Sequence, residues 1–332
     1  LVAGQTNGAP SWFPCNDRPS NKARYKFEIT ASSTYHVLAN GVLTKSRRGA
    51  STTTWEYEQS EPMATYLATV QIGRYTTLNV PSATVPMNAV LPDRLIHKYH
   101  NAFSRQPEML AFFERVFGPY PFPAYTVVVT ADRLEIPLEA QGVSVFGANF
   151  LTGDWENVRL VAHELSHQWF GNSLTLADWR DIWLHEGFAC YSEWLWSEES
   201  GGRRADARAR EHWSRLAGKS QNLLLGDPGP DDMFDDRVYK RGALLLHALR
   251  LTVGDEDFFK LLPEWVQRNT YGSVTTAMFV ELAEQVCGPP LQDLFSRWLS
   301  ERALPQLPPV PPPGVVTSPS GPALTSAPEP AP

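Results

Sequence analysis

The chain has 332 residues, of which 42% are hydrophobic, enough to form a sizeable core and two domains. Its formal net charge of −7 argues against the basic surface that phosphate backbones require, so we expect no nucleic-acid partner. We see no run of about 20 apolar residues that would predict a membrane span. Three scattered cysteines predict no disulfide framework and leave the compartment, cytoplasmic or secreted, undetermined.

Residues 22–78 are predicted to form strands. The runs KFEITA, YHVLANGVL, TTTWEYE and ATYLATVQIGRY are rich in β-branched and aromatic residues, and turn residues such as Asn40-Gly41 and Arg48-Gly49 separate them. We interpret residues 1–80 as the C-terminal part of an all-β sandwich domain. The rest of that sandwich, and any signal sequence, would lie before residue 1.

The pattern changes to helices after about residue 84. A helical stretch near 93–117 ends at Gly118-Pro119, and two strand-like runs, TVVVT (126–130) and GVSVFG (142–147), follow it. Beyond residue 154 the chain is predicted to be almost wholly helical to about residue 302. A strand region that leads into a run of helices predicts an α+β fold.

The last 30 residues, 303–332, contain 11 prolines and no aromatic residue. Such a segment cannot bury enough apolar surface to offset its ordering entropy. We therefore predict a disordered tail or linker, with a wall anchor or polyproline ligand as the alternative.

The sequence His163-Glu164-Leu165-Ser166-His167 has the spacing of a zinc site on a helix. Residues four apart lie about 40° apart around a helix and one turn along it, so both imidazoles can reach one ion. A catalytic zinc requires a third protein ligand and an open position for water. Glu186 follows His167 after 18 intervening residues, which include a turn signal, Gly171-Asn172. We predict one Zn²⁺ per chain, held by His163, His167 and Glu186.

Four segments, two of which contain these ligands, resemble the aminopeptidase N family of zinc metallopeptidases, which are gluzincins. HELSHQWFGN and WLHEGFACYSEWLW resemble the metal-binding helices of that family, WFPCNDRPSNKARYKFEI (12–29) its β-domain and VYKRGALLLH (238–247) a later helix. The resemblance implies a thermolysin-like, mostly helical catalytic domain, residues 81–302, packed against the β-sandwich.

Peptide hydrolysis requires activated water, a stabilised oxyanion and a protonated leaving amine. Glu164 lies beside the ligands without being one, so we expect it to act as the general base and later to deliver the proton. The resemblance implies that Tyr239 donates its phenol hydroxyl to the oxyanion. The alternative for Tyr239 is a packed helix residue.

The resemblance also implies recognition of the substrate's free α-amino group. The family uses a Gly-x-Met-Glu-Asn strand, and the equivalent stretch here is IPLEAQG (136–142), with Glu139 in place of the amine-binding glutamate. Ile136, Leu138 and Ala140 stand where the family has Gly, Met and Asn, so the shape of the first subsite is open. Gln5 is the candidate for a second amine contact, or an ordinary loop residue.

Histidines that bind metal usually donate their second ring N–H to a carboxylate. Glu193 is the main candidate because it lies seven residues after Glu186, on the same helical face. Asp178 and Asp181 are alternatives, and any of the three could be solvated.

We predict a zinc-dependent aminopeptidase that acts on peptides with a free N-terminus. The first rival is an endopeptidase with the same metal core, which the altered Gly-x-Met-Glu-Asn stretch leaves open. The second is a catalytically inactive fold that serves as a binding module.

Overall fold

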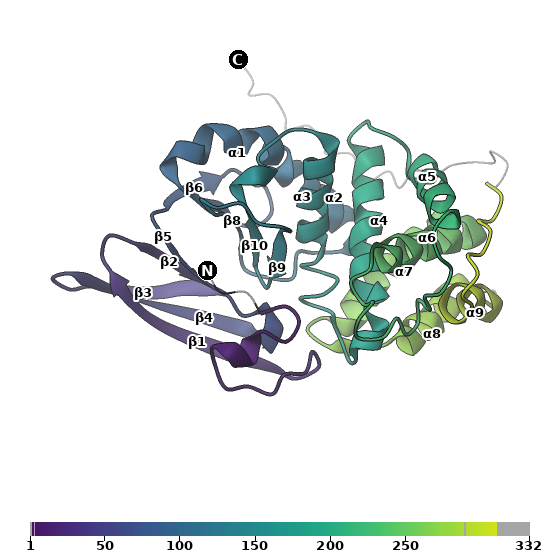
Figure 1. Cartoon of the computed structure of the whole chain (residues 1–332), viewed down its shortest axis with the longest axis horizontal. Coiled ribbons are helices and arrows are strands. Elements are labelled where there is room, and N and C mark those ends of the chain that lie inside the picture. Colours follow the sequence, from purple (N-terminus) through teal and green to yellow (C-terminus); the bar gives the residue numbers. More distant parts are fainter. Residues whose placement is uncertain (1, 3, 289, 311–332) are drawn as a thin grey trace, which may run out of the picture.

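The computed structural model describes residues 2, 4–288 and 290–310. A β-rich N-terminal part precedes a mostly helical part, and the two lie side by side (Figure 1). This arrangement confirms the predicted α+β fold.

The N-terminal part contains two antiparallel sheets. The larger has the strand order β1-β4-β3, and the smaller pairs β2 with β5. The strands are β1 (Lys22–Ser32), β2 (His36–Ala39), β3 (Val42–Arg48), β4 (Thr52–Ala64) and β5 (Val70–Gly73). Val37, Trp55 and Tyr57 of these strands are buried together, so the alternating apolar pattern in the sequence gives one buried face.

The predicted turn Asn40-Gly41 does not close a hairpin but takes the chain from one sheet to the other. Gly41 has φ +85°, and a β-carbon there would lie 2.1 Å from a carbonyl oxygen of β4, so only glycine fits. The buried Asn40 side chain donates to the carbonyls of Leu67 and Gln141, both at 3.0 Å, and accepts from the amide of Thr69. This asparagine therefore ties the β-rich part to the strand region that follows.

A five-stranded mixed sheet, in the order β6-β7-β8-β10-β9, begins the second part. Its strands are β6 (Thr76–Val80), β7 (Met87–Leu91), β8 (Tyr125–Val129), β9 (Leu138–Ala140) and β10 (Val143–Phe146). The domain boundary that we expected at residue 80 falls within the β6–β7 hairpin. We propose that the boundary lies nearer residue 75, where the chain leaves β5.

The predicted helix near 93–117 is two helices, α1 (Ile96–Phe103) and α2 (Gln106–Phe117), which a short turn separates. Pro107 lies in the first turn of α2, where a missing N–H is tolerated. Gly118, with φ +94°, ends α2 as the Gly-Pro signal predicted.

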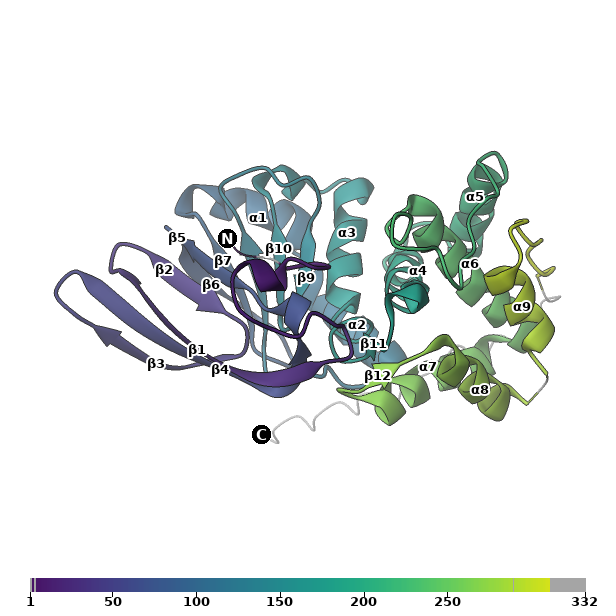
Figure 2. The same ribbon diagram turned by 60° about the horizontal axis from the view of Figure 1, so that its bottom comes forward.

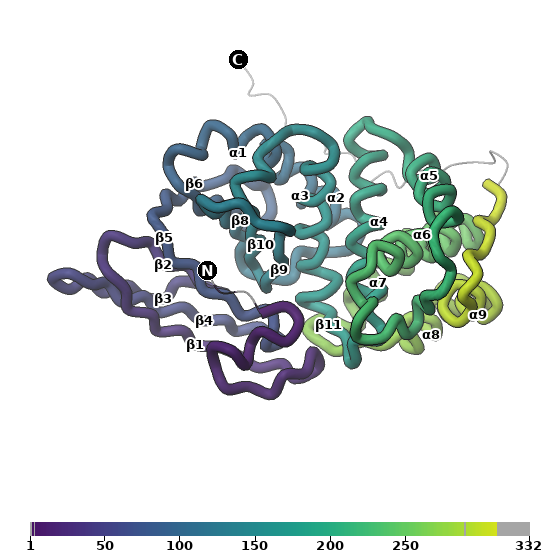
Figure 3. The backbone as a smooth tube through the Cα atoms, viewed as in Figure 1, coloured from purple at the N-terminus to yellow at the C-terminus, as the bar shows by residue number. Residues whose placement is uncertain are grey.

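The remaining helices gather on the side of the molecule away from the N-terminal sheets (Figure 2). They are α3 (Trp155–Ser166), α4 (Trp183–Glu199), α5 (Ala205–Ala217), α6 (Asp236–Val253), α7 (Asp255–Asn269), α8 (Thr276–Cys287) and α9 (Gln292–Ser300). Helix α3 lies between the strands β9 and β10 and helix α4 (Figure 3). A short parallel pair, β11 (Thr175–Leu176) and β12 (Ser273–Val274), joins the α3–α4 connection to the α7–α8 connection.

Helices α4 and α6 cross with their backbones in contact. A β-carbon on Gly187 of α4 would lie 2.8 Å from the Cα of Gly242 of α6, closer than packed atoms tolerate. The two glycines therefore set the spacing between these helices.

The segment for which we predicted disorder, 303–332, is described only to residue 310. Trp213 of α5 donates its indole N–H to the carbonyl of Pro305 at 2.7 Å, and Leu304 and Leu307 pack against the core. Residues 304–307 of the predicted tail are therefore packed against the helical part, and residues 311–332 lie outside the described part. Among the described residues, every helix is too short or too polar to cross a bilayer.

Candidate metal centre

The first two candidate residues, His163 and Glu164, lie in the last turn of α3. The helix begins at Asp154, whose carboxylate accepts from the amide of Asn157 at 3.1 Å. His167 follows the last residue of α3 but keeps helical backbone angles, and its amide donates to the carbonyl of His163. The one-turn spacing that the sequence predicted for the two histidines is therefore present.

The chain reverses direction directly after His167. Gly171 has φ +134°, and a β-carbon there would lie 3.2 Å from Nδ1 of His167, so a larger residue would disturb the histidine. The amide of Gly171 donates to the carbonyl of Leu174, which closes the turn. The chain then passes through β11 into α4, which carries Glu186 and Glu193.

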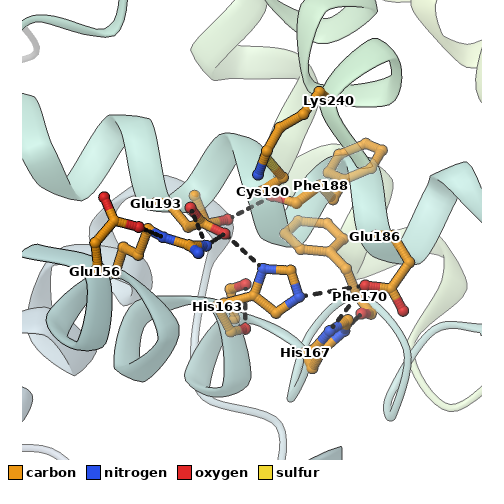
Figure 4. Close-up of polar contacts among 12 residues, drawn as sticks. Glu156, His163, His167, Phe170, Glu186, Phe188, Cys190, Glu193 and Lys240 are labelled. Atoms are coloured by element: carbon orange, nitrogen blue, oxygen red, sulfur yellow. Dashed lines mark hydrogen bonds and ion pairs between the residues drawn. The ribbon is translucent and has the colours of Figure 1, made fainter. Parts of the chain in front are cut away.

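The side chains of His163, His167 and Glu186 converge (Figure 4). Oε2 of Glu186 lies 3.2 Å from Nε2 of His163 and 3.5 Å from Nε2 of His167, and all three candidate ligand atoms lie within 4.8 Å of one another. Nδ1 of His163 faces Glu193, and Nδ1 of His167 faces the carbonyl of Phe170, both at 2.9 Å. When both Nδ1 atoms donate, both Nε2 lone pairs face Glu186.

This arrangement of donors fits a zinc ion. Zinc binds nitrogen and oxygen at about 2.0–2.1 Å, so two ligands of a tetrahedral site lie about 3.3–3.4 Å apart, close to the observed 3.2 and 3.5 Å. All three side chains are buried. Burial lowers the pKa of His167, but Glu139 and Glu186 together raise it to about 10. The carboxylates thus favour a positive charge here, and a bound cation would supply it.

Glu164 is buried beside this triad. Burial raises the pKa of its carboxyl group, and its Oε2 accepts no hydrogen bond from the described residues. A buried acceptor without a partner is costly, so such groups usually face water or a ligand. Glu164 also lines the same cavity as the candidate metal ligands.

Glu139 lies in β9, the edge strand of the mixed sheet, and it lines the cavity on the side of the N-terminal part. Burial raises its pKa to about 8. Gln5 donates from Nε2 to Oε1 of Glu139 at 2.5 Å, although the two residues are 134 positions apart. The structure thus brings together the two side chains that the resemblance connected with the substrate amine.

Tyr239 lies in the first turn of α6. Its ring is stacked on that of His163, with the centroids 5.9 Å apart. Burial raises the pKa of its hydroxyl far above the usual value, so the phenol keeps its proton and can donate it.

Glu193 holds the outer nitrogen of His163. Its Oε1 lies 2.9 Å from Nδ1 of His163, and Arg159 donates to its Oε2 at 3.3 Å. Burial raises the pKa of Glu193, but Lys240, His163 and Arg159 hold it down at about 2. Glu193 is therefore an ionised acceptor beside Nδ1 of His163.

The two alternatives to Glu193 have other partners. Asp178 accepts from the amide of Arg180 near the surface, and Asp181 accepts from Oγ1 of Thr276 at 2.6 Å. Among the described residues, neither hydrogen-bonds to the candidate ligands.

Sequence reasoning missed Arg159 and Lys240. Arg159 precedes His163 by four residues, so helical periodicity alone could have placed it beside Glu193. Lys240 has no such signal, because its contact, from Nζ to Sγ of Cys190 at 3.3 Å, joins two different helices.

A cavity of about 560 Å³ contains the whole site, a volume typical of small-ligand sites. Its walls come from β9, α3, α4, α5 and α6, together with Gln5 and Phe234.

Two protein families and several known aminopeptidases are similar to this chain. The Peptidase family M1 domain matches residues 101–298, and the Peptidase M1 N-terminal domain matches residues 3–67. Aminopeptidase M1-D from Oryza sativa is 27% identical over 321 residues, which cover 88% of this chain and 36% of that protein. Leucyl aminopeptidase from Saccharolobus solfataricus is 24% identical and covers 90% of this chain and 40% of that protein.

A solved M1 zinc metallopeptidase from Deinococcus radiodurans superimposes with a TM-score of 0.83. It is 32% identical, and the match covers 92% of this chain and 70% of that one. The chain spans only about two fifths of the length of these two curated relatives.

Proposed function

The chain belongs to peptidase family M1, and from this premise we propose that it is a zinc-dependent aminopeptidase that removes N-terminal residues from peptides. The observation that carries the proposal is the position of Glu139 in the cavity. A buried carboxylate on an edge strand lies beside two histidines and a glutamate whose ligand atoms converge. This combination suits a substrate with a positive charge next to the bond that is cleaved.

His163, His167 and Glu186 would hold one zinc ion. When bound, zinc lowers the pKa of water to about 7 and polarises the carbonyl of the scissile bond. Glu193 keeps the proton of His163 on Nδ1, so that Nε2 of His163 stays free to bind metal.

Glu164 is proposed as the general base. Its free oxygen faces the cavity, where it can accept a proton from the attacking water and pass it to the leaving amine. Burial raises the pKa of its carboxyl group, which makes its carboxylate a stronger base.

Tyr239 is proposed to donate its hydroxyl to the oxyanion of the tetrahedral intermediate. A single donor of this kind contributes about 3 kcal/mol in comparable sites. Its high pKa supports the role, since only the protonated phenol can donate.

Glu139 and Gln5 are proposed to bind the α-ammonium group of the substrate. The ammonium would offset the cost of a buried carboxylate and hold the first peptide bond over the metal ligands. Gln5 leaves one oxygen of Glu139 for the substrate because its hydrogen bond is made to Oε1 alone.

The product pattern from a long peptide tests the proposal. Peptides sampled over time by mass spectrometry should lose single N-terminal residues in order, and an N-acetylated twin should resist cleavage. The Glu164→Gln variant controls for contaminating peptidases. Early internal fragments would show an endopeptidase, and lack of cleavage in both peptides would favour a binding module.

A further inference from the structure

The cavity has two ends of different chemistry. Glu139 and Gln5 line the end formed by β9 and the N-terminal segment, and helices α5 and α6 line the other end. Four cations line the cavity from α5, from α6 and from the residues just after α5, namely Arg208, Arg215, Lys219 and Lys240, against two carboxylates, Glu211 and Asp236.

The proposed function fixes which part of a substrate meets each end. If Glu139 binds the α-ammonium, the first residue lies on the β9 side and the scissile carbonyl lies at His163, His167 and Glu186. The leaving part of the peptide must then extend toward α5 and α6.

Three cations that line this part of the cavity already have carboxylate partners. Arg159 contacts Glu193, Arg215 contacts Glu211, and Lys219 contacts Asp236. These pairs have little charge left for a ligand.

Lys240 and Arg208 differ from these three. Within the part of the chain that the structure describes, neither has a carboxylate oxygen within 4.0 Å. Among residues 2, 4–288 and 290–310, Nζ of Lys240 donates only to Sγ of Cys190, a weak acceptor. Arg208 donates from Nε to Oγ of Ser197 at 3.3 Å, and its guanidinium lies 4.1 Å above the ring of Trp155.

Lys240 remains charged despite its partial burial. Burial lowers the pKa of its ammonium, but Cys190 and Glu193 raise it above the usual value. Glu193 and Lys240 attract each other, but among the described residues no oxygen of Glu193 lies within 4.0 Å of Nζ of Lys240, so the two do not form a contact ion pair. An ammonium has three donors, and Cys190 takes one of them.

We propose that Lys240 and Arg208 bind a carboxylate of the leaving peptide, so that the enzyme prefers short peptides with a free C-terminus or an acidic residue after the scissile bond. The proposal rests on the proposed aminopeptidase function. It gives the cavity a negative end for the substrate ammonium and a positive end for the substrate carboxylate. A cavity of about 560 Å³ suits a peptide of a few residues.

Matched substrate pairs test the proposal on the full chain with zinc bound. Leu-Gly-Gly is compared with its C-terminal amide, and Leu-Asp-Gly amide with Leu-Asn-Gly amide, with kcat/KM measured for each. The first pair isolates a terminal carboxylate and the second a side-chain carboxylate. We expect the charged member of at least one pair to be cleaved about tenfold faster, as for one charge-assisted contact.

For each variant, the ratio of kcat/KM between the charged and the uncharged member of each pair is measured. A general loss of activity affects both members and therefore cancels. In the pair that the wild-type enzyme discriminates, Lys240→Met should bring the ratio close to one and Lys240→Arg should restore part of the preference. Arg208→Gln should lower the same ratio. Lys219→Met is the matched control, because Lys219 lines the same cavity but is paired with Asp236, and it should keep the wild-type ratio.

Two results would overturn the inference and leave the aminopeptidase proposal intact: both wild-type ratios close to one, or ratios that neither Lys240→Met nor Arg208→Gln changes. If thermal unfolding shows that Lys240→Met is not folded, Arg208→Gln decides. If the wild-type enzyme cleaves neither the acids nor the amides, the proposed function fails and this inference fails with it.

Discussion

The site has a helical end, which carries the candidate metal ligands, and an amine end, formed by Gln5 and Glu139. These two ends are built in different ways. His163 and Glu186 are only 23 positions apart and lie on consecutive helices, so helix periodicity and one turn bring them together. Gln5 and Glu139 are 134 positions apart and meet only because the β-rich part packs against the edge strand β9.

This difference shows which functions depend on local structure and which depend on the contact between the two parts. Metal binding and proton transfer should withstand changes in the N-terminal part. Recognition of the substrate amine should not withstand such changes.

The largest effects should come from the helical end. His163→Ala should lose both zinc and activity, because it removes a ligand. Glu164→Gln removes only the base, so zinc should be retained. Its kcat should fall by several orders of magnitude, more than the roughly 10²–10⁴-fold in rate that one acid–base group typically contributes. Elemental analysis and turnover of both variants check this. Full zinc occupancy in His163→Ala would remove that residue from the site.

Changes at the amine end should leave zinc in place. Glu139→Ala should lower kcat/KM for free-amine substrates by roughly 100- to 1,000-fold, because it removes the charge partner of the ammonium. Gln5→Ala should cost only about tenfold, as expected for one hydrogen bond to a charged group. Zinc content measured in parallel separates the two ends. Zinc loss in Glu139→Ala would contradict the separation.

Tyr239→Phe tests a residue between the two ends. The ring that stacks on His163 is kept and only the hydroxyl is lost, so kcat should fall by roughly 100-fold with little change in KM. Normal kinetics with a lower melting temperature would make this tyrosine structural.

The smallest predicted effect concerns the acceptor behind the metal. Glu193→Gln can still accept from His163 but loses its charge, so zinc affinity should fall roughly 10- to 100-fold. Competition with a chelator measures this. Asp178→Asn is the matched control, because Asp178 has no contact with the candidate ligands among the described residues, and it should bind zinc normally.

The candidate residues of the helical end could be named from local sequence patterns, and their roles stay predictions. The motif HELSHQWFGN led to the resemblance to the aminopeptidase N family, which the family matches confirm. The seven-residue spacing placed Glu193 on the face of Glu186, because helical periodicity is a local property.

Features that depend on distant contacts could not be predicted from local patterns. The strand β9 was expected only from the family resemblance, because its three residues lie in a stretch without strand alternation and its pairing is with β10. Asn40-Gly41 is a turn in the sequence, but its role in joining two sheets depends on Leu67, Thr69 and Gln141. The pairing of Lys240 with Cys190 needs the crossing of α4 and α6.

The contact between Gly187 and Gly242 has a consequence for how mutations in this family would be interpreted. Gly187 follows the candidate ligand Glu186, and Gly242 lies one turn after Tyr239, so this backbone contact fixes the position of the tyrosine relative to Glu186. One added methyl group at either glycine would push the helices apart. In a random-mutation screen, an alanine at either position would be scored as the loss of a catalytic residue, although neither glycine has a side chain that could take part in the reaction.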